Sequence, residues 1–178
     1  TQSFLTTITS GIYVAGGSGG NTLASSTDGI NWTGRGANVF TTRCLTVAYG
    51  NNLYVAGGQG GNSVATSTDG INWTGRGTGS LSTIVNGIAY GNNIWVALGQ
   101  DGTGSYTLST SPNGISWTPR TGTTIFSYGY DVVYGNNQFV AVGSGPNLFA
   151  TSPDGINWTG RGGSTVFSSH PNKVAYGN

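Results

Sequence analysis

Four arginines recur at one position of an internal repeat, and they are well suited to binding an anionic ligand. Each lies three residues after a repeated tryptophan. A guanidinium group holds a carboxylate or a sulfate through paired hydrogen bonds, so a ring of these groups could bind an acidic sugar. The structural alternative is that each side chain packs its stem on the next repeat and donates to loop carbonyls. The four residues are Arg35, Arg76, Arg120 and Arg161.

A second group of side chains breaks the repeat and is a further candidate for binding. Tyrosine rings beside a carboxylate suit stacking on a sugar and hydrogen bonding to it. The alternative is that these residues fill space around an insertion in the longer third repeat. They are Asp101, Tyr106, Tyr128 and Tyr130.

Acid-base catalysis needs more free carboxylates than this sequence offers. The chain has 5 acidic residues, all of them aspartate, and most glycosidases place two carboxylates around one bond. Three of the aspartates lie in the turns of a repeated heptapeptide and Asp131 begins a predicted strand, which leaves Asp101. No motif places a serine or cysteine nucleophile beside a base. The sequence therefore predicts a protein that is not an enzyme.

Residues that commonly hold metals are sparse. His170 is the one histidine and Cys44 the one cysteine, and the aspartates lack the spacing of a ligand set. We expect no metal and no cofactor, and the apolar neighbours of Cys44 predict a buried thiol. Three Asn-Trp-Thr sequons could accept glycans in a eukaryotic secretory pathway. Their asparagines are Asn31, Asn72 and Asn157.

The composition argues against two classes of partner. Charged residues make up 6% of the chain, and the formal net charge is +1 without a basic run. The sequence therefore lacks the cluster of positive charge that is typical of nucleic-acid binding. No apolar run approaches the roughly 20 residues of a membrane helix, so we expect no membrane insertion. A net charge near zero favours self-association. The absence of methionine predicts a processed form or a piece of a longer protein.

The elements that position these side chains follow from a heptapeptide that occurs four times, at residues 26–32, 67–73, 111–117 and 152–158. Its tryptophans are 41, 44 and 41 residues apart, a period typical of propeller blades. Helical repeats of similar period are excluded because glycine and β-branched runs dominate and no 3.6-residue apolar pattern persists. We predict an all-β, single-domain propeller of four four-stranded blades, with repeats at about 1–44, 45–86, 87–131 and 132–178.

Each repeat is predicted to contain four short strands. In the second repeat these strands are 45–49, 53–56, 63–66 and 71–74. A Gly-Asn-Asn turn joins the first two strands, and a glycine-rich loop joins the next two. The Gly-Asn-Asn turns and the heptapeptides then lie at one end of each blade. Because the loops and the crossings at the other end vary, we expect any ligand to bind there.

The heptapeptide resembles the Asp-box (BNR) motif, Ser-x-Asp-x-Gly-x-x-Trp, in a form one residue shorter between Asp and Gly. The resemblance covers all four repeats and is to boxes of sialidase-like and related bacterial and viral propellers. In that family the box is a structural hairpin, usually remote from the active site. The third repeat departs from the pattern with asparagine for aspartate. The box residues are Asp28, Trp32, Asp69, Trp73, Asn113, Trp117, Asp154 and Trp158.

The resemblance implies a sialidase-like glycosidase fragment as a remote alternative. Sialidases of that family use a tyrosine assisted by glutamate, an aspartate acid/base and three arginines, and this chain has no glutamate. We instead expect a non-catalytic structural or assembly subunit of a fibre, coat or appendage, or a binding module. A lectin-like propeller that binds glycans is the alternative. The expected location is extracellular, at a cell surface or at a virion surface.

The strand count predicts self-association through a terminal strand. Four repeats supply five candidate first strands, because residues 4–8 can precede the strand at 12–15 while 174–176 can begin a further blade. The surplus strand is free to pair with a neighbouring molecule. The alternative is that the chain is a fragment of a longer array of blades.

Overall fold

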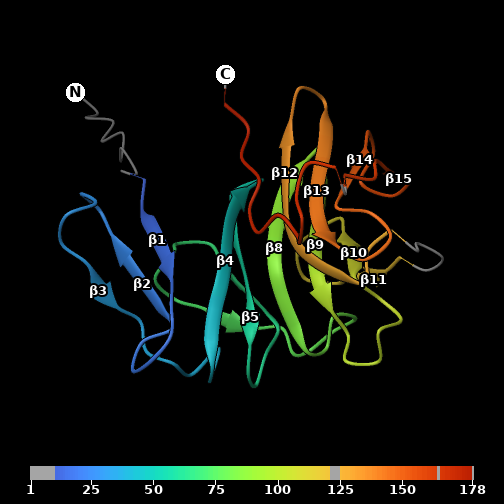
Figure 1. The fold of residues 1–178 in the computed structure, drawn as a ribbon. Helices are drawn as coiled ribbons and strands as arrows, with labels where there is room; N and C mark the ends of the chain where they lie inside the picture. The colour runs from blue at the N-terminus through green and yellow to red at the C-terminus, as the bar shows by residue number, and fades with distance from the viewer. Residues whose placement is uncertain (1–10, 121–124, 164, 178) are drawn as a thin grey trace, which may run out of the picture.

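The computed structural model describes residues 11–120, 125–163 and 165–177. Strands, turns and loops make up this part of the chain, and they contain no helix (Figure 1). A helix long and apolar enough to cross a membrane is accordingly absent from these ranges. The prediction of an all-β chain is confirmed.

Four antiparallel sheets follow one another along the chain, each built from consecutive strands. The first sheet comprises β1 (Tyr13–Gly16), β2 (Leu23–Ser26) and β3 (Thr33–Gly34). The second comprises β4 (Arg43–Gly50), β5 (Leu53–Gln59), β6 (Val64–Ser67) and β7 (Thr74–Gly75). The third comprises β8 (Ile84–Gly91), β9 (Ile94–Gln100), β10 (Leu108–Ser111) and β11 (Thr118–Pro119). The fourth comprises β12 (Tyr128–Gly135), β13 (Gln138–Ser144), β14 (Phe149–Ser152) and β15 (Thr159–Gly160).

In the second, third and fourth sheets the first strand contacts the first strand of a neighbouring sheet, and we call it the inner strand. The first sheet has no inner strand in the described part of the chain. Its order is β1-β2-β3, whereas each of the others begins with an eight-residue inner strand, β4, β8 or β12. The predicted strand at 4–8 lies outside the described residues. The predicted strand at 174–176 is described but forms no strand. One edge of β1 therefore has no partner among the described strands.

Two-residue turns set the register of the first hairpin in each complete sheet. Asn51 and Asn52 have φ values of 48° and 57°, the left-handed conformation that a type I′ turn requires at both positions. The Asn-Asn pairs at 92–93 and 136–137 have the same geometry. The register is the same in all three sheets, where Tyr49 faces Tyr54, Tyr90 faces Trp95 and Tyr134 faces Phe139.

Consecutive sheets pack against each other through their inner strands. The strand β1 contacts β4, β4 contacts β8 and β8 contacts β12. At the end of an inner strand a glycine lies under the tyrosine ring of the next one, because a Cβ on Gly91 would lie only 2.0 Å from Cγ of Tyr134. Two of the largest fully buried side chains, Trp95 and Phe139, lie in these contacts. The core is therefore divided among the spaces between sheets.

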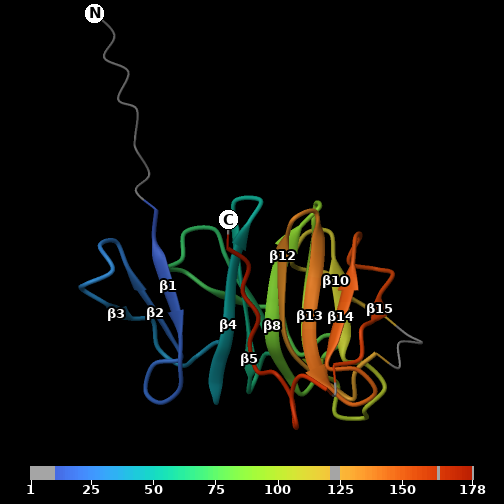
Figure 2. The ribbon, with the colours of Figure 1, turned by 45° about the horizontal axis from the view of Figure 1, so that its top comes forward.

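The four sheets form an arc that does not close. The strands β1–β3 lie at one end and β14 and β15 at the other in both ribbon views (Figures 1 and 2). Within the described residues, no strand pairing joins the first sheet to the fourth. The C-terminal segment runs in front of the inner strands, between β4 and β12 (Figure 1). A closed ring of four blades is thus not formed by these residues.

Candidate functional site

Each heptapeptide forms a turn that its own side chains close. In the first box Asp28 Oδ1 accepts hydrogen bonds from the backbone amides of Asn31 at 2.7 Å and Ile30 at 2.8 Å, and Oδ2 accepts one from the Asn31 side chain at 2.7 Å. Together these donors hold the pKa of Asp28 well below its usual value. Trp32 Nε1 donates to the Gly29 carbonyl at 3.1 Å. The box is thus a self-contained hairpin.

The other boxes repeat this arrangement with one exception. Hydrogen bonds from Asn72 lower the pKa of Asp69 in the same way. At Asp154 burial raises the pKa, but hydrogen bonds, above all those from Asn157, lower it by more. In the third box Asn113 Oδ1 accepts from the amides of residues 115 and 116, both at 2.9 Å, and from the Ser111 hydroxyl at 3.1 Å. Residue 116 is a serine, so this box has no counterpart of the side-chain amide that donates to the aspartate in the other boxes.

The sequon asparagines take part in these turns. Their side chains are exposed, and each side-chain amide donates to the box aspartate at 2.7 Å. The nitrogen that a glycan would modify is thus part of the hairpin. The residues are Asn31, Asn72 and Asn157.

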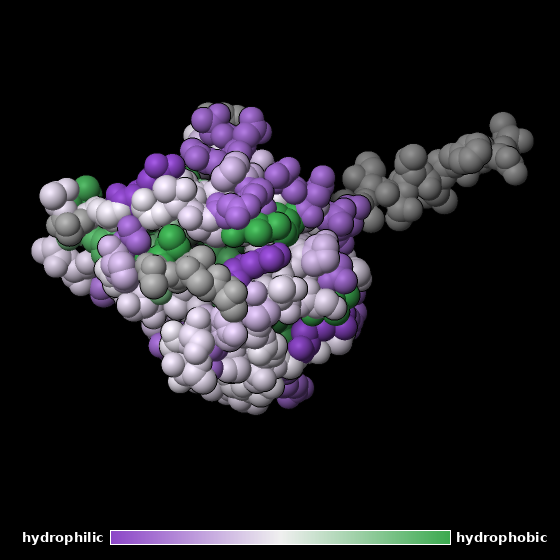
Figure 3. Space-filling model, turned by 90° about the vertical axis from the view of Figure 1, so that its right-hand side faces the viewer, coloured by the Kyte–Doolittle hydropathy of each residue, from purple (hydrophilic) through white to green (hydrophobic). Residues whose placement is uncertain are grey.

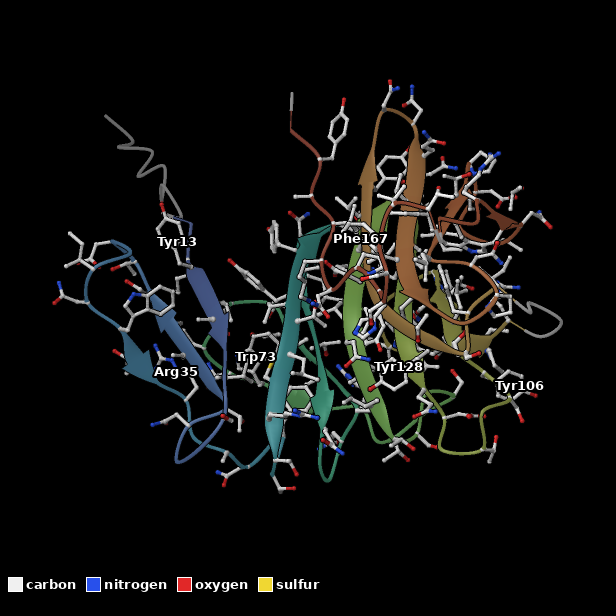
Figure 4. The ribbon with its side chains drawn as sticks, in the orientation of Figure 1. Tyr13, Arg35, Trp73, Tyr106, Tyr128 and Phe167 are labelled. Carbon is white, nitrogen blue, oxygen red and sulfur yellow. The ribbon has the colours of Figure 1, made fainter. Side chains whose placement is uncertain are left out.

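The four arginines are held separately, each by its own sheet. Each follows an outermost strand, and its Nε donates to a hydroxyl group of the adjacent strand at 2.7–2.9 Å. The outermost strands pair only with the third strand of their own sheet, and Arg35 lies beside β3 in Figure 4. The acceptors are side-chain hydroxyls rather than loop carbonyls. The pairs are Arg35 with Ser25, Arg76 with Thr66, Arg120 with Thr110 and Arg161 with Thr151.

Asp101 and Tyr106 have local structural contacts in the loop between β9 and β10. Asp101 Oδ1 accepts from the backbone amides of Thr103 at 3.0 Å and Gly104 at 2.8 Å, and Oδ2 accepts from the Thr103 hydroxyl at 2.6 Å. Burial raises the pKa of Asp101, but these hydrogen bonds lower it overall. Tyr106 packs against the core cluster that contains Trp95. It lies apart from Tyr128 in Figure 4.

Tyr128 and Tyr130 lie together with His170, which the sequence did not predict to be part of a binding site. The Tyr128 and Tyr130 ring centroids are 4.9 Å apart, and the Tyr130 ring stacks on His170 at 4.6 Å with an interplanar angle of 15°. Tyr130 is the extra residue of a β-bulge in β12, a distortion that changes the direction of a side chain. The hydroxyl of Ser169 lies 2.9 Å from His170 Nδ1. We call Tyr128, Tyr130 and His170 the aromatic cluster.

An ion pair ties the C-terminal segment to the inner strands. Lys173 Nζ lies 3.6 Å from Asp131 Oδ1 and donates to the Asn86 carbonyl of β8 at 3.4 Å. The Val174 amide donates to Asp131 Oδ2 at 3.2 Å. The sequence prediction did not assign Asp131, His170 or Lys173 to a site. One signal was available, because His170 and Lys173 are the chain's single histidine and single lysine.

The described residues hold no metal-binding group and one isolated thiol. No cluster of three or more His, Cys, Asp or Glu side chains with metal-binding potential occurs among them. Cys44 is buried, and this burial raises the pKa of its thiol to about 12. The thiol therefore stays protonated at neutral pH, a form that is a poor nucleophile.

Hollows lie between neighbouring sheets. A small cavity of about 40 Å³ lies between the second and third sheets, and its lining includes Arg76, Ser80 and Trp117. A larger open hollow of about 410 Å³ lies between the first and second sheets, with Ile12 and Tyr49 in its lining. The larger hollow lies beside the first sheet, for which the described residues supply no inner strand.

No model of a known protein family matches this chain. No curated protein matches it either. Among solved structures, an ancestral GH74 enzyme is similar with 24% identity and a TM-score of 0.54, over 76% of this chain and 20% of the enzyme. A structure of YCF48 bound to D1 peptide is similar with 17% identity and a TM-score of 0.46, over 77% of this chain and 46% of YCF48.

The chain thus spans about a fifth of the length of the GH74 enzyme, since it covers 20% of it. The likeness shows the fold alone, which is of the β-propeller type. It agrees with the succession of antiparallel sheets packed through their inner strands.

Proposed function

We propose that this chain is a non-catalytic β-propeller module that acts by association, as a structural or assembly subunit or as a binding module. The supporting observation is that all 5 acidic side chains of the chain are engaged within it. Three hold box turns, Asp101 closes a loop and Asp131 pairs with Lys173. Glycoside hydrolysis generally needs two carboxylates facing one bond, and no such pair stands free here.

A glycosidase is the competing function, because a GH74 enzyme shares the fold and the Asp-box resemblance implies sialidase-like chemistry. The test is incubation of the chain with fluorogenic sialosides and with a panel of other fluorogenic glycosides. We expect no product above the buffer rate. Turnover that is lost in Asp131→Asn but kept in Asp101→Asn would replace the proposal with an enzyme centred on the inner strands.

A lectin-like role is the second candidate, and the aromatic cluster favours it. Aromatic rings with a hydroxyl or a ring nitrogen can stack on a sugar and hydrogen-bond to it. Tyr128, Tyr130 and His170 are half-buried and present such groups together. Binding on a glycan array that is lost in Tyr130→Ala and kept in Tyr106→Ala would support this role. An array without binding would leave assembly as the function.

We further propose that the ring closes between molecules. The sequence predicts a ring of four blades from one chain, with larger rings of several chains as the alternative. Support for the larger ring comes from the open arc, in which β1 keeps an unpaired edge within the described part of the chain. Light scattering between about 1 and 100 µM should give a mass above that of the monomer that increases with concentration. A monomer throughout this range would refute assembly.

An extracellular, cell-surface or virion-surface location is the corresponding proposal for where the module acts. It is supported by a composition with 6% charged residues and 33 glycines, in which polar uncharged side chains carry the solubility. Immunogold labelling of intact source cells or particles tests this location. Labelling that requires permeabilisation would contradict it.

A further inference from the structure

The C-terminal segment 173–177 occupies the place of a further inner strand. Tyr176 lies over Gly135, since a Cβ there would be 2.2 Å from Cγ of Tyr176. Two other glycine-tyrosine pairs, between β4 and β8 and between β8 and β12, have the same geometry. These pairs are Gly50 with Tyr90 and Gly91 with Tyr134.

A hydrogen bond from a backbone amide to a side chain also indicates that the C-terminal segment is equivalent to an inner strand. The Val174 amide donates to the Asp131 side chain at 3.2 Å, and the Ile88 amide of β8 donates to the Thr46 side chain of β4 at 3.2 Å. Val174 and Ile88 each lie two residues before the tyrosine that recurs at this position of each repeat, Tyr176 and Tyr90. The segment therefore lies against β12 as β8 lies against β4, but it has no sheet of its own.

The first sheet has the complementary deficiency. Its β1 carries Tyr13 at the position of Trp95 and Phe139, yet Tyr13 is 59% exposed while both of those side chains are fully buried. Tyr49 of the neighbouring β4 is 58% exposed, although its equivalents Tyr90 and Tyr134 cover a glycine of the preceding inner strand. Among the described residues, no inner strand bearing such a glycine lies beside β1 and β4.

The outer face of the first sheet has no neighbouring sheet within the described part of the chain either. At the three interfaces between sheets, a box glycine packs on the second strand of the preceding sheet, as Gly114 does on Leu53 and Val55. Gly29 of the first box meets only Tyr13 of its own sheet. Ile30 beside it is 81% exposed, against 38–42% for the equivalent isoleucines. A preceding sheet would cover this face.

We propose that the first sheet of a second copy docks on the C-terminal segment, so that the two chains together form one blade. This proposal rests on the proposed function, because it names the surface through which the module associates. The segment supplies the inner strand, and β1–β3 of the second copy supply the other three strands. The backbone groups on the open edge of β1 hydrogen-bond to the segment, as a strand adds to any open sheet edge.

The repeat fixes the register of this shared blade. Val47 faces Ala56, Tyr49 faces Tyr54 and Gly50 faces Leu53 in the second sheet. By equivalence Val174 faces Ala15, Tyr176 faces Tyr13 and Gly177 faces Ile12 of the second copy. Tyr49 of that copy then covers Gly177, whose surroundings are empty in the single chain.

The occupant is a second copy because docking keeps the observed contact between sheets. The same glycine-tyrosine contact recurs along the arc, and with these contacts β1 stays unpaired with its own C-terminal segment. Closing one chain on itself would require the packing of the sheets to change, whereas a second copy adds one more contact of the same kind. Such head-to-tail contacts use two unlike surfaces and can close into rings.

A disulfide between two separate single-cysteine variants tests the shared blade. In a two-residue hairpin the pair next to the turn exchanges hydrogen bonds, so Val47 and Ala56 form a non-hydrogen-bonded pair, with Cα atoms about 4.5 Å apart. That spacing suits a disulfide. All variants also carry Cys44→Ser, which removes the chain's own cysteine. Chains with Ala15→Cys are mixed with chains carrying Val174→Cys under mild oxidation, and the linked peptides are identified by mass spectrometry. A disulfide in this mixture can form only between molecules.

We expect the 15–174 disulfide in the mixture and at least tenfold less of it when Ala175→Cys, one position out of register, replaces Val174→Cys. The double variant Ala15→Cys/Val174→Cys serves as the internal comparison. If it forms a disulfide within one chain while the mixture forms none, the chain closes on itself and the proposal is wrong. If neither sample links, another strand occupies the edge of β1 and the proposal is also wrong.

Failure of this register can be told apart from failure of the proposed function. Unmodified chain that associates in light scattering, without the 15–174 link, would keep assembly and reject this interface. Gly177→Ala should weaken association at least tenfold without changing the melting temperature, because nothing in the single chain lies within 4 Å of its added Cβ. Gly20→Ala, equally unobstructed and without a positive φ, lies in the loop that follows β1; it is the matched control and should leave association unchanged.

Discussion

The contact between consecutive sheets predicts a large loss of stability for Gly91→Ala. The φ of Gly91 is not positive, so alanine fits the backbone, but its Cβ would lie 2.0 Å from Cγ of Tyr134. An ordinary contact needs about 3.4 Å or more, so the ring must withdraw by over 1 Å. That movement disturbs its packing on Phe139, whose ring centroid is 4.7 Å away.

The expected cost follows from these contacts. Overpacking costs about 1–3 kcal/mol, and a weakened aromatic pair adds about 0.5–1.5 kcal/mol. We expect the free energy of unfolding to fall by about 2–3 kcal/mol and the melting temperature to fall by roughly 4–12 °C. Urea unfolding followed by tryptophan fluorescence, at a concentration where the chain is monomeric, measures the change. A value within about 0.5 kcal/mol of wild type would refute the inter-sheet contact, with Gly177→Ala as the neutral control.

Three other predictions concern the hairpins and the arginines. Asn113→Asp should stabilise the chain by about 0.5–1 kcal/mol at pH 7, because a charged acceptor strengthens the hydrogen bonds from residues 115 and 116; an unchanged thermal melting point would contradict this. The lowered pKa values of Asp69 and Asp154 stabilise the fold above the unfolded-state pKa of about 3.9, and this contribution is lost as the pH falls toward the folded values. Urea midpoints should therefore be constant from about pH 8 to 5 and fall below about pH 4, less steeply in Asp69→Asn. Arg76→Ala should cost less than about 1 kcal/mol, since the exposed side chain makes one hydrogen bond to Thr66; a loss above 2 kcal/mol in calorimetry would indicate a larger role.

The period of the heptapeptide predicts the sheets well but their ends less well. The predicted strand 45–49 is the centre of β4, which extends to Arg43–Gly50. The extension contains a β-bulge, and the bulge has no common residue type because Leu45, Asn86 and Tyr130 are the extra residues. The predicted strand 71–74 is shorter in the structure, where β7 is Thr74–Gly75. The hydrogen bonds to Asp69 keep residues 71 and 72 in the turn.

The candidate site was harder to predict than the fold. A repeat shows which residues occupy equivalent positions, but it does not show whether the equivalent side chains of different sheets lie close together. Positions on inner strands face one another, as Lys173 and Asn86 do. Residues that follow the outermost strands lie far from their equivalents in the other sheets. Each arginine therefore donates to a hydroxyl group of its own sheet. The aromatic cluster joins Tyr130 to His170, and it depends on a C-terminal segment whose path no local pattern specifies.

The same repetition explains why the ends of the chain are suited to association. Each sheet has two apolar faces, and the contact between two consecutive sheets buries one face of each, so an arc always leaves two unlike faces uncovered. Here one uncovered face carries Tyr13, Ile30 and Trp32, exposed by 59%, 81% and 46%. The side that carries β14 and β15 shows separate hydrophobic patches among hydrophilic residues (Figure 3). Because few charges oppose contact between such faces, burying them against each other is favourable. The first sheet has no inner strand among the described residues, and the C-terminal segment at the other end of the arc is placed like an inner strand.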